Sequence, residues 1–131
     1  MDSFCQTWSP RVLSVLRMVT ALLFLQHGTA KYLGFPPVAD FANLQFLSLL
    51  GASGVLELVG GVLMLIGLFT RPVAFILSGF MAVAYFLAHA SQGFYPLLNQ
   101  GELAVLYCFV FLYLSVAGGG AWSLDAARRA A

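Results

Sequence analysis

The stretch GASGVLELVGGVLMLIGLFTR, residues 51–71, decides the fold. One charged side chain, Glu57, lies inside an apolar run that ends at Arg71. At 1.5 Å of rise per residue, about 20 apolar residues cross the hydrocarbon core of a bilayer as a helix. An acid inside such a helix is energetically costly and by default faces the interior of a bundle. The stretch therefore predicts a membrane-spanning helix, and it marks Glu57 as the first candidate for a function.

The composition of the whole chain agrees with a membrane protein. Of its 131 residues, 61% are hydrophobic and 8% are charged, whereas soluble domains are roughly 25% charged. The length fits a single domain over residues 1–131. A formal net charge of +1 supplies no basic field for nucleic acid. We therefore expect an integral membrane protein whose partner is the lipid bilayer, and we exclude nucleic-acid binding.

Four apolar runs predict an all-α, four-helix bundle in the membrane. The first run exceeds the apolar region of a cleaved signal peptide and contains Arg17 and Gln26, so it is expected to stay as a span. Pro72 directly after Arg71 suits the first turn of a new helix, which makes the second and third spans a tight hairpin. The last run is the shortest and must begin in the interface or thin the bilayer. The expected spans are residues 12–33, 46–69, 72–90 and 102–117.

The basic residues predict the orientation. With four spans, Lys31 lies on one side of the membrane, and the arginines lie on the other, so both termini are expected in the cytoplasm. Ser123 reads as a helix cap with Asp125 in the first turn, which predicts a short C-terminal surface helix anchored by Trp122. The arginines are Arg11, Arg17, Arg71, Arg128 and Arg129. Arg71 is further expected to bond carbonyls at the end of the second span.

Several ionisable side chains fall inside or at the ends of the spans. Helix rise places His27 about 22 Å up the first span and Glu57 about 18 Å up the second, so the two are expected at a similar depth. Lys31 lies one turn further out than His27. Arg17, about 8 Å from the cytoplasmic edge, is expected to reach either lipid phosphates or Glu57. His89 and Glu102 lie near the outer ends of the third and fourth spans.

Two interpretations of Glu57 stay open at this stage. Gly54 and Gly61 share its helix face, and the space they leave suits either a packed neighbouring helix or a ligand. In the structural interpretation Glu57 is protonated and hydrogen-bonded, or is neutralised by Arg17 or His27. In the functional interpretation it accepts a proton or binds the polar head of a ligand.

The remaining chemical motifs are few. His27 and His89 would suit bis-histidine haem ligation, although hydrogen bonding explains both more simply. Cys5 and Cys108 form no C-x-x-C pair, so a redox role would require a bound cofactor. The sequence contains no Walker, Rossmann or zinc pattern, and we expect no metal site.

Five segments in order resemble the DoxX family of small four-helix bacterial membrane proteins. They are HGTAKYLGF (27–35), ELVGGVLMLIGLFTRP (57–72), FMAVAYFLAH (80–89), NQGELAVLY (99–107) and GGGAWSLD (118–125). The early arginine of that family is matched by Arg17, and its G-x-x-K by Gly28 and Lys31. Its E-x-x-G-G and the following G-x-x-T/S-R are matched by Glu57, Gly60, Gly61, Gly67, Thr70 and Arg71.

The resemblance implies a multi-pass protein of the bacterial inner membrane with a redox-linked role. The family is similar to the membrane subunits of a thiosulfate:quinone oxidoreductase, and some members are thought to act beside soluble redox partners in oxidative-stress defence. It implies a quinone-like ligand, with Glu57 and His27 handling the proton. The residues expected to complete the site are Lys31, His89, Glu102, Arg17 and Tyr85. The alternative is a non-catalytic accessory or scaffold subunit in a larger complex or a homo-oligomer, without enzymatic turnover.

Overall fold

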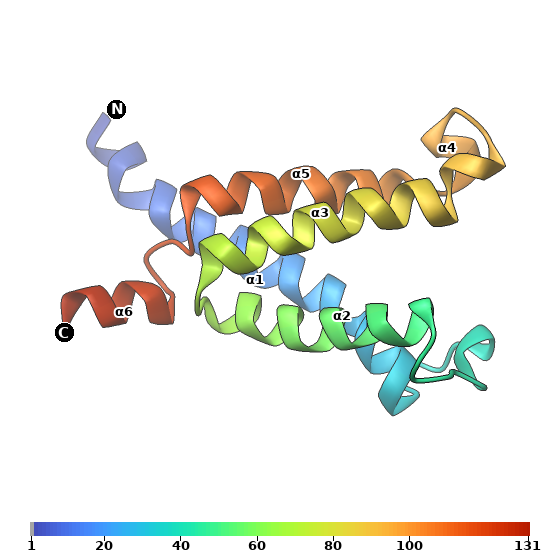
Figure 1. Cartoon of the computed structure of the whole chain (residues 1–131). Coiled ribbons are helices and arrows are strands. Elements are labelled where there is room, and N and C mark those ends of the chain that lie inside the picture. The colour runs from blue at the N-terminus through green and yellow to red at the C-terminus, as the bar shows by residue number, and fades with distance from the viewer. Residues whose placement is uncertain (1) are drawn as a thin grey trace. The chain divides into compact units, whose positions relative to one another are not determined.

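The computed structural model describes residues 2–131, and these are 78% helical with no strand. The all-α prediction is therefore confirmed. The elements in chain order are α1 (Asp2–Leu33), η1 (Ala39–Phe41), α2 (Leu49–Ile66), α3 (Thr70–Ala88), η2 (Ala90–Gln92), α4 (Pro96–Asn99), α5 (Glu102–Ala117) and α6 (Leu124–Ala130) (Figure 1).

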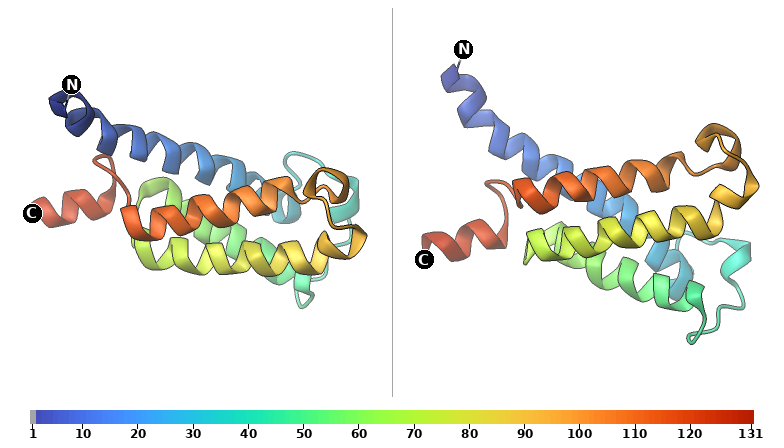
Figure 2. Two further views of the ribbon diagram at one scale, coloured as in Figure 1. Left: turned by 90° about the horizontal axis from the view of Figure 1, so that it is seen from above. Right: turned by 45° about the horizontal axis from the view of Figure 1, so that its top comes forward.

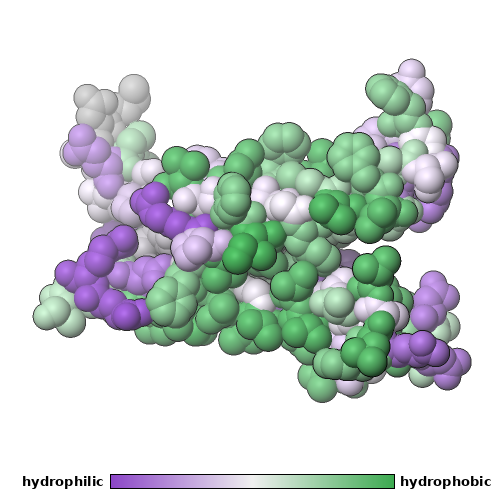
Figure 3. All heavy atoms as spheres, in the orientation of Figure 1, coloured by the Kyte–Doolittle hydropathy of each residue, from purple (hydrophilic) through white to green (hydrophobic). Residues whose placement is uncertain are grey.

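Three helical segments are long and apolar enough to cross a membrane: Ser3–Leu33, Leu49–Ile66 and Thr70–Gln92. Large hydrophobic side chains on these helices remain exposed, such as Val59 at 56% and Phe75 at 66%, as lipid-facing residues are. Figure 3 shows hydrophobic side chains along the helices and hydrophilic ones gathered at helix ends and loops. The apolar helix Glu102–Ala117 is shorter, at 16 residues. A fourth span and the side on which the termini lie therefore stay predictions.

Three helix ends differ from the limits of the expected spans, for local reasons. Helix α1 begins at Asp2 and contains Pro10, because a proline removes one backbone donor without forbidding the helix around it. Helix α2 starts at Leu49 because Ser48 caps it, its Oγ accepting from the Gly51 N–H at 3.0 Å. It ends at Ile66 because Gly67 adopts the left-handed conformation, with φ of 70°.

The chain forms two compact units. Unit 1 contains residues 2–69 and 119–131, and unit 2 contains residues 70–118. In unit 1 the antiparallel helices α1 and α2 approach closely at glycines. A methyl group added to Gly28 would lie 2.8 Å from the Leu58 nitrogen, and one added to Gly61 would lie 2.9 Å from Leu25 Cδ1. The glycine face of α2 is thus a helix-packing face, as one of the two interpretations held.

Unit 2 is built on α3 and α5, which run side by side (Figure 2). The Ser78 hydroxyl donates to the Cys108 carbonyl at 2.8 Å. Arg71 donates to the Val116 carbonyl at the end of α5. The expectation that Arg71 bonds the end of the second span was wrong; the carbonyls left free by the last turn of α5 take that guanidinium instead.

The C-terminal segment returns to unit 1. Helix α6 begins where predicted, with the Ser123 Oγ accepting from the Ala126 N–H at 3.1 Å. The Asp125 carboxylate accepts from the Phe69 N–H at 2.9 Å, and the Asp125 N–H donates to the Gly67 carbonyl at 3.0 Å. The predicted cap and short C-terminal helix are confirmed, and α6 is joined to the end of α2 by hydrogen bonds. Its place at the membrane surface stays a prediction.

Candidate functional site

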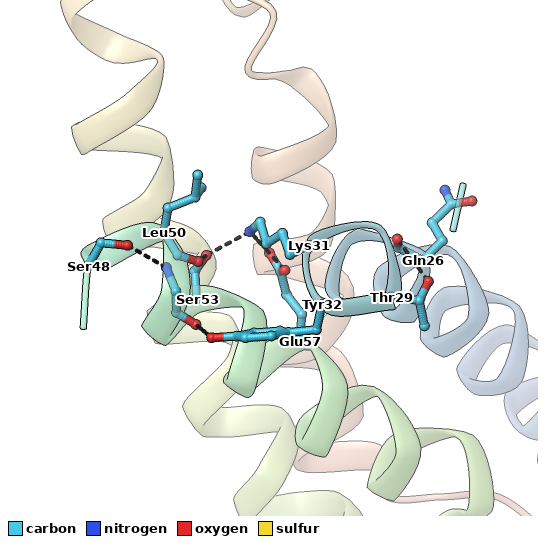
Figure 4. Close-up of polar contacts among 9 residues, drawn as sticks. Gln26, Thr29, Lys31, Tyr32, Ser48, Leu50, Ser53 and Glu57 are labelled. Carbon is cyan, nitrogen blue, oxygen red and sulfur yellow. Dashed lines mark hydrogen bonds and ion pairs between the residues drawn. The ribbon is translucent and has the colours of Figure 1, made fainter. Parts of the chain in front are cut away.

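A buried ion pair joins α1 to α2 (Figure 4). The Lys31 Nζ lies 2.8 Å from both carboxylate oxygens of Glu57 and donates to the Ser53 Oγ at 2.6 Å. The side chains of Lys31 and Glu57 are only 6% and 8% exposed. A lysine ammonium has three N–H donors, and all three are used in this arrangement.

The positions of these side chains follow from the local helices. Gly28 of α1 lies against Glu57, since a methyl group added there would be 3.1 Å from the Glu57 Cβ. Lys31 is one turn later on the same face, and its long stem brings the ammonium to the acid. Ser53 lies one turn before Glu57 on α2 and donates onward to the Leu50 carbonyl at 2.7 Å. Tyr32 adds a bond from its hydroxyl to the Gly51 carbonyl at 2.7 Å.

A partly open hollow adjoins Lys31 where α1 meets its connection to α2. Its volume is about 620 Å³, which lies within the roughly 300–1,000 Å³ of small-molecule sites. The Phe41 ring in its wall has its centroid 5.5 Å from the Lys31 Nζ. Apart from Lys31, the lining side chains are apolar or absent. The lining residues are Ala30, Lys31, Gly34, Pro37, Val38, Ala39, Phe41 and Ala42.

The depth estimate from the sequence was close, but the assigned partner of the acid was wrong. Gly28, next to His27, lies against Glu57, so the two helices meet at the expected level. The cation paired with Glu57 is Lys31, whereas the sequence had offered Arg17 or His27. His27 is half-buried one turn before Lys31. Its proposed role with the proton stays a prediction.

Arg17 serves a different part of unit 1. It is fully buried, and its guanidinium donates to the carbonyls of Met64, Leu65, Gly119 and Trp122. The last carbonyls of a helix have no partner within that helix, and a guanidinium offers five donors. Arg17 therefore caps α2 and binds the C-terminal segment, in place of the lipid phosphates or Glu57 that the sequence suggested.

The outer residues of unit 2 form a cluster of their own. The His89 Nδ1 donates to the Asn99 carbonyl at 2.9 Å, and the Asn99 Nδ2 donates to the Tyr85 hydroxyl at 3.1 Å. The rings of Tyr85 and His89 are stacked with centroids 6.4 Å apart. Glu102 is exposed in the first turn of α5. Participation of His89, Tyr85 and Glu102 in the site at Glu57 stays a prediction.

Asn99 was missed by the sequence analysis although it is fully buried. Besides Tyr85, its amide donates to the Gly93 carbonyl and its Oδ1 accepts from the Gly101 N–H, each at 2.8 Å. A buried amide with such partners organises a loop. The available signal was its place between a proline and a glycine in PLLNQG, where side-chain to backbone bonds are common.

Known proteins resemble this chain over most of its length. The DoxX family model matches residues 12–90, more than half of the chain. An uncharacterised protein of Haemophilus influenzae is 47% identical over 124 residues, 92% of each chain. Inner membrane protein YqjF of Escherichia coli is 29% identical over 120 residues, 85% of this chain and 87% of the relative. No solved structure matches.

Three helices long and apolar enough to cross a membrane, together with a relative from the inner membrane, confirm the expected location, a multi-pass protein of the bacterial inner membrane. The expectation of a lipid bilayer as partner is confirmed with it. The resemblance seen in the sequence is likewise confirmed by the family match over residues 12–90. The chain belongs to the DoxX family.

Proposed function

We propose that this inner-membrane protein binds a quinone-like head group in the hollow beside Lys31 and Glu57, as a membrane subunit of a redox system. The observation that carries the proposal is the buried ion pair of Lys31 with Glu57, in which Lys31 also lines an apolar hollow of about 620 Å³. Ligand sites in proteins combine apolar walls with a few placed polar groups. The hollow and the pair together have that composition.

The side chains fit the chemistry of such a ligand. A quinone, when bound, supplies two-electron redox chemistry that is coupled to protons. Lys31 would donate a hydrogen bond to a ring carbonyl, which takes the place of the Ser53 hydroxyl that it now contacts at 2.6 Å. Glu57 would hold the exchanged proton, because it is the carboxylate in contact with the ammonium. Phe41 and the small side chains of the wall would pack against the ring.

A second candidate is a structural role, in which the chain is an accessory or scaffold subunit of a membrane complex. Two observations favour it. All three donors of the Lys31 ammonium are satisfied within unit 1. The glycine face beside Glu57 is filled by α1, with Tyr32 and Lys31 against Gly54. In this role the pair fixes the register of α1 and α2, as buried polar groups do in some proteins.

The Glu57→Gln variant separates the two candidates. Quinones extracted from purified native protein and from the variant are quantified by mass spectrometry after quinone is added to both. The proposal expects at least about a tenfold weaker retention in the variant, which equals about 1.4 kcal/mol of binding. Asp40→Asn, an exposed acid of the same connection, is the matched control and should retain quinone. Equal retention by the native protein and Glu57→Gln would reject the proposed ligand role.

A further inference from the structure

A second group of side chains, made of arginines and tryptophans, lies at the end of unit 1 far from Lys31. Arg11 and Lys31 are twenty residues apart on α1, about 30 Å along the helix. The group contains three arginines and both tryptophans of the chain. We call it the basic rim, and its members are Arg11, Arg128, Arg129, Trp8 and Trp122.

Hydrogen bonds hold the C-terminal part of this rim against α1. The Ala121 N–H donates to the Pro10 carbonyl at 3.0 Å, and the Trp122 N–H donates to the Ser14 Oγ at 2.9 Å. Arg17 binds the Trp122 carbonyl from below the surface. Together with the Asp125 bonds to the end of α2, these contacts fix where α6 begins. Arg128 and Arg129 therefore have a defined position on unit 1.

The arginines of the rim have unused hydrogen-bonding capacity. The Arg11 guanidinium lies 5.2 Å from the centroid of the Trp8 ring, and that of Arg128 lies 5.4 Å from the Phe69 ring. Within the part of the chain that the structure describes, none of Arg11, Arg128 and Arg129 donates a side-chain hydrogen bond. The aromatic contacts hold the guanidinium groups of Arg11 and Arg128 in place and leave their N–H donors to an external acceptor.

The local charge balance is positive. Among the described side chains of this end, the acid is Asp125, and its carboxylate caps the Phe69 N–H. The C-terminal helix carries both of its arginines in its last turn. Hydrophilic residues accordingly gather over α6 in Figure 3. Such a surface is complementary to an anion whose oxygens accept several hydrogen bonds.

We propose that the basic rim binds the head group of an anionic phospholipid. The rim lies at the first turns of α1 and beside the end of α2, two helices long and apolar enough to cross a membrane. Its tryptophans are 44% and 53% exposed, as rings at the head-group level are. Val12 and Val15 follow on α1, 59% and 44% exposed, where an acyl chain would lie. The phosphate would accept hydrogen bonds from the arginines, and the excess of positive charge selects an anionic over a zwitterionic lipid.

The test uses tryptophan fluorescence, because both tryptophans of the chain belong to the rim. The protein is reconstituted in phosphatidylcholine vesicles that contain the same small fraction of brominated phosphatidylglycerol or brominated phosphatidylcholine. Quenching should be stronger with the brominated phosphatidylglycerol, and the preference should weaken as salt is added. Each Arg→Gln change in the rim should reduce the preference about fivefold. Equal quenching by the two lipids in the native protein would overturn the proposal.

Two controls test whether the arginine charges and the lipid itself cause the preference in tryptophan quenching. Arg128→Lys with Arg129→Lys keeps the charges and should keep most of the preference, whereas Arg128→Gln with Arg129→Gln should lose it. Both arginines are exposed, so the variants are expected to fold, and circular dichroism checks their helix content. Inorganic phosphate at millimolar concentration should leave the quenching unchanged. Loss of quenching on its addition would identify a free anion as the ligand and contradict the lipid assignment.

Discussion

The helix pairs of the two units share one kind of contact, between an arginine and the carbonyls at a helix end, but in different surroundings. In each, an arginine on the first helix binds carbonyls at the end of the second: Arg17 at Met64 in unit 1, and Arg71 at Val116 in unit 2. Toward the opposite end of each helix pair lies a polar cluster, Lys31 with Glu57 in unit 1 and Asn99 with Tyr85 in unit 2. Arg17 is fully buried under the C-terminal segment, whereas Arg71 is exposed. The contact between arginine and helix end is therefore expected to contribute more to stability in unit 1 than in unit 2.

The polar clusters differ in charge, and this difference indicates where chemistry is expected. Unit 1 buries an ammonium against a carboxylate, beside a hollow. Unit 2 joins the neutral amide of Asn99 to Tyr85 and to the loop. Burying full charges in a membrane protein is costly and often functional, while a satisfied amide mainly fixes a loop. The predictions below test this contrast.

The largest expected effect follows the removal of one member of the ion pair. Glu57→Leu leaves the buried Lys31 ammonium without its counter-ion and should cost about 3–5 kcal/mol of unfolding free energy. The double variant Glu57→Leu with Lys31→Met should recover most of that loss, because apolar replacement of a buried pair is often tolerated. Reversible unfolding in mixed micelles measures both. A double variant as unstable as the single one would show that the pair is needed for the fold itself.

The next largest effect is a difference in stability loss between variants of Arg17 and Arg71. Arg17→Met removes bonds from a buried charge to four carbonyls and should cost at least about 3 kcal/mol, since a hydrogen bond to a charged group contributes roughly 1.5–3 kcal/mol net. Arg71→Met removes an exposed contact and should cost under about 1 kcal/mol. The same unfolding assay compares them. Similar losses for both variants would contradict the contrast between a buried and an exposed cap.

Asn99 tests the neutral cluster of unit 2. Asn99→Leu leaves the Gly93 carbonyl and the Gly101 N–H without their side-chain partner, and should cost about 1–3 kcal/mol. Hydrogen exchange should rise in the loop before α5, while quinone retention at the hollow stays near native. Loss of quinone in this variant would mean that the cluster of unit 2 belongs to the ligand site.

The last comparison concerns two glycines, Gly54 in unit 1 and Gly79 in unit 2. A methyl group at Gly54 would lie 2.6 Å from Tyr32 Cε2, so Gly54→Ala should destabilise unit 1 by about 1–3 kcal/mol. At Gly79 in α3 nothing lies within 4 Å of the added methyl, so Gly79→Ala should be neutral or slightly stabilising. Thermal unfolding of the two variants side by side measures the difference. If Gly54→Ala is also neutral, the glycine face has more space than close packing allows.

The sequence predicted the helices and the C-terminal cap well because these depend on local patterns. Apolar runs mark the long helices, and Ser123 followed by Asp125 defines the start of α6. The packing role of the glycines was also one of the interpretations offered. The depth of Glu57 could be counted from helix rise, which is fixed by geometry.

The partners of the buried charges could not be predicted in the same way. Helix rise gives the depth of a residue but not the rotation of one helix against another. Gly28 therefore faces Glu57 where His27 was expected, and the long side chain of Lys31 reaches back to the acid. Arg17 depends on a segment more than 100 residues later, and Asn99 on the path of its loop. Contacts of this kind require the tertiary structure.

The most direct test of the central claim locates a bound quinone on the chain. A long-tailed quinone with a photoreactive ring is added to the purified protein, irradiated and mapped by peptide mass spectrometry. The proposed site predicts labelling within residues 30–42, with loss of the label when unmodified quinone competes. Labelling confined to residues 85–99, or labelling that competition does not reduce, would contradict a ligand site beside Lys31 and Glu57.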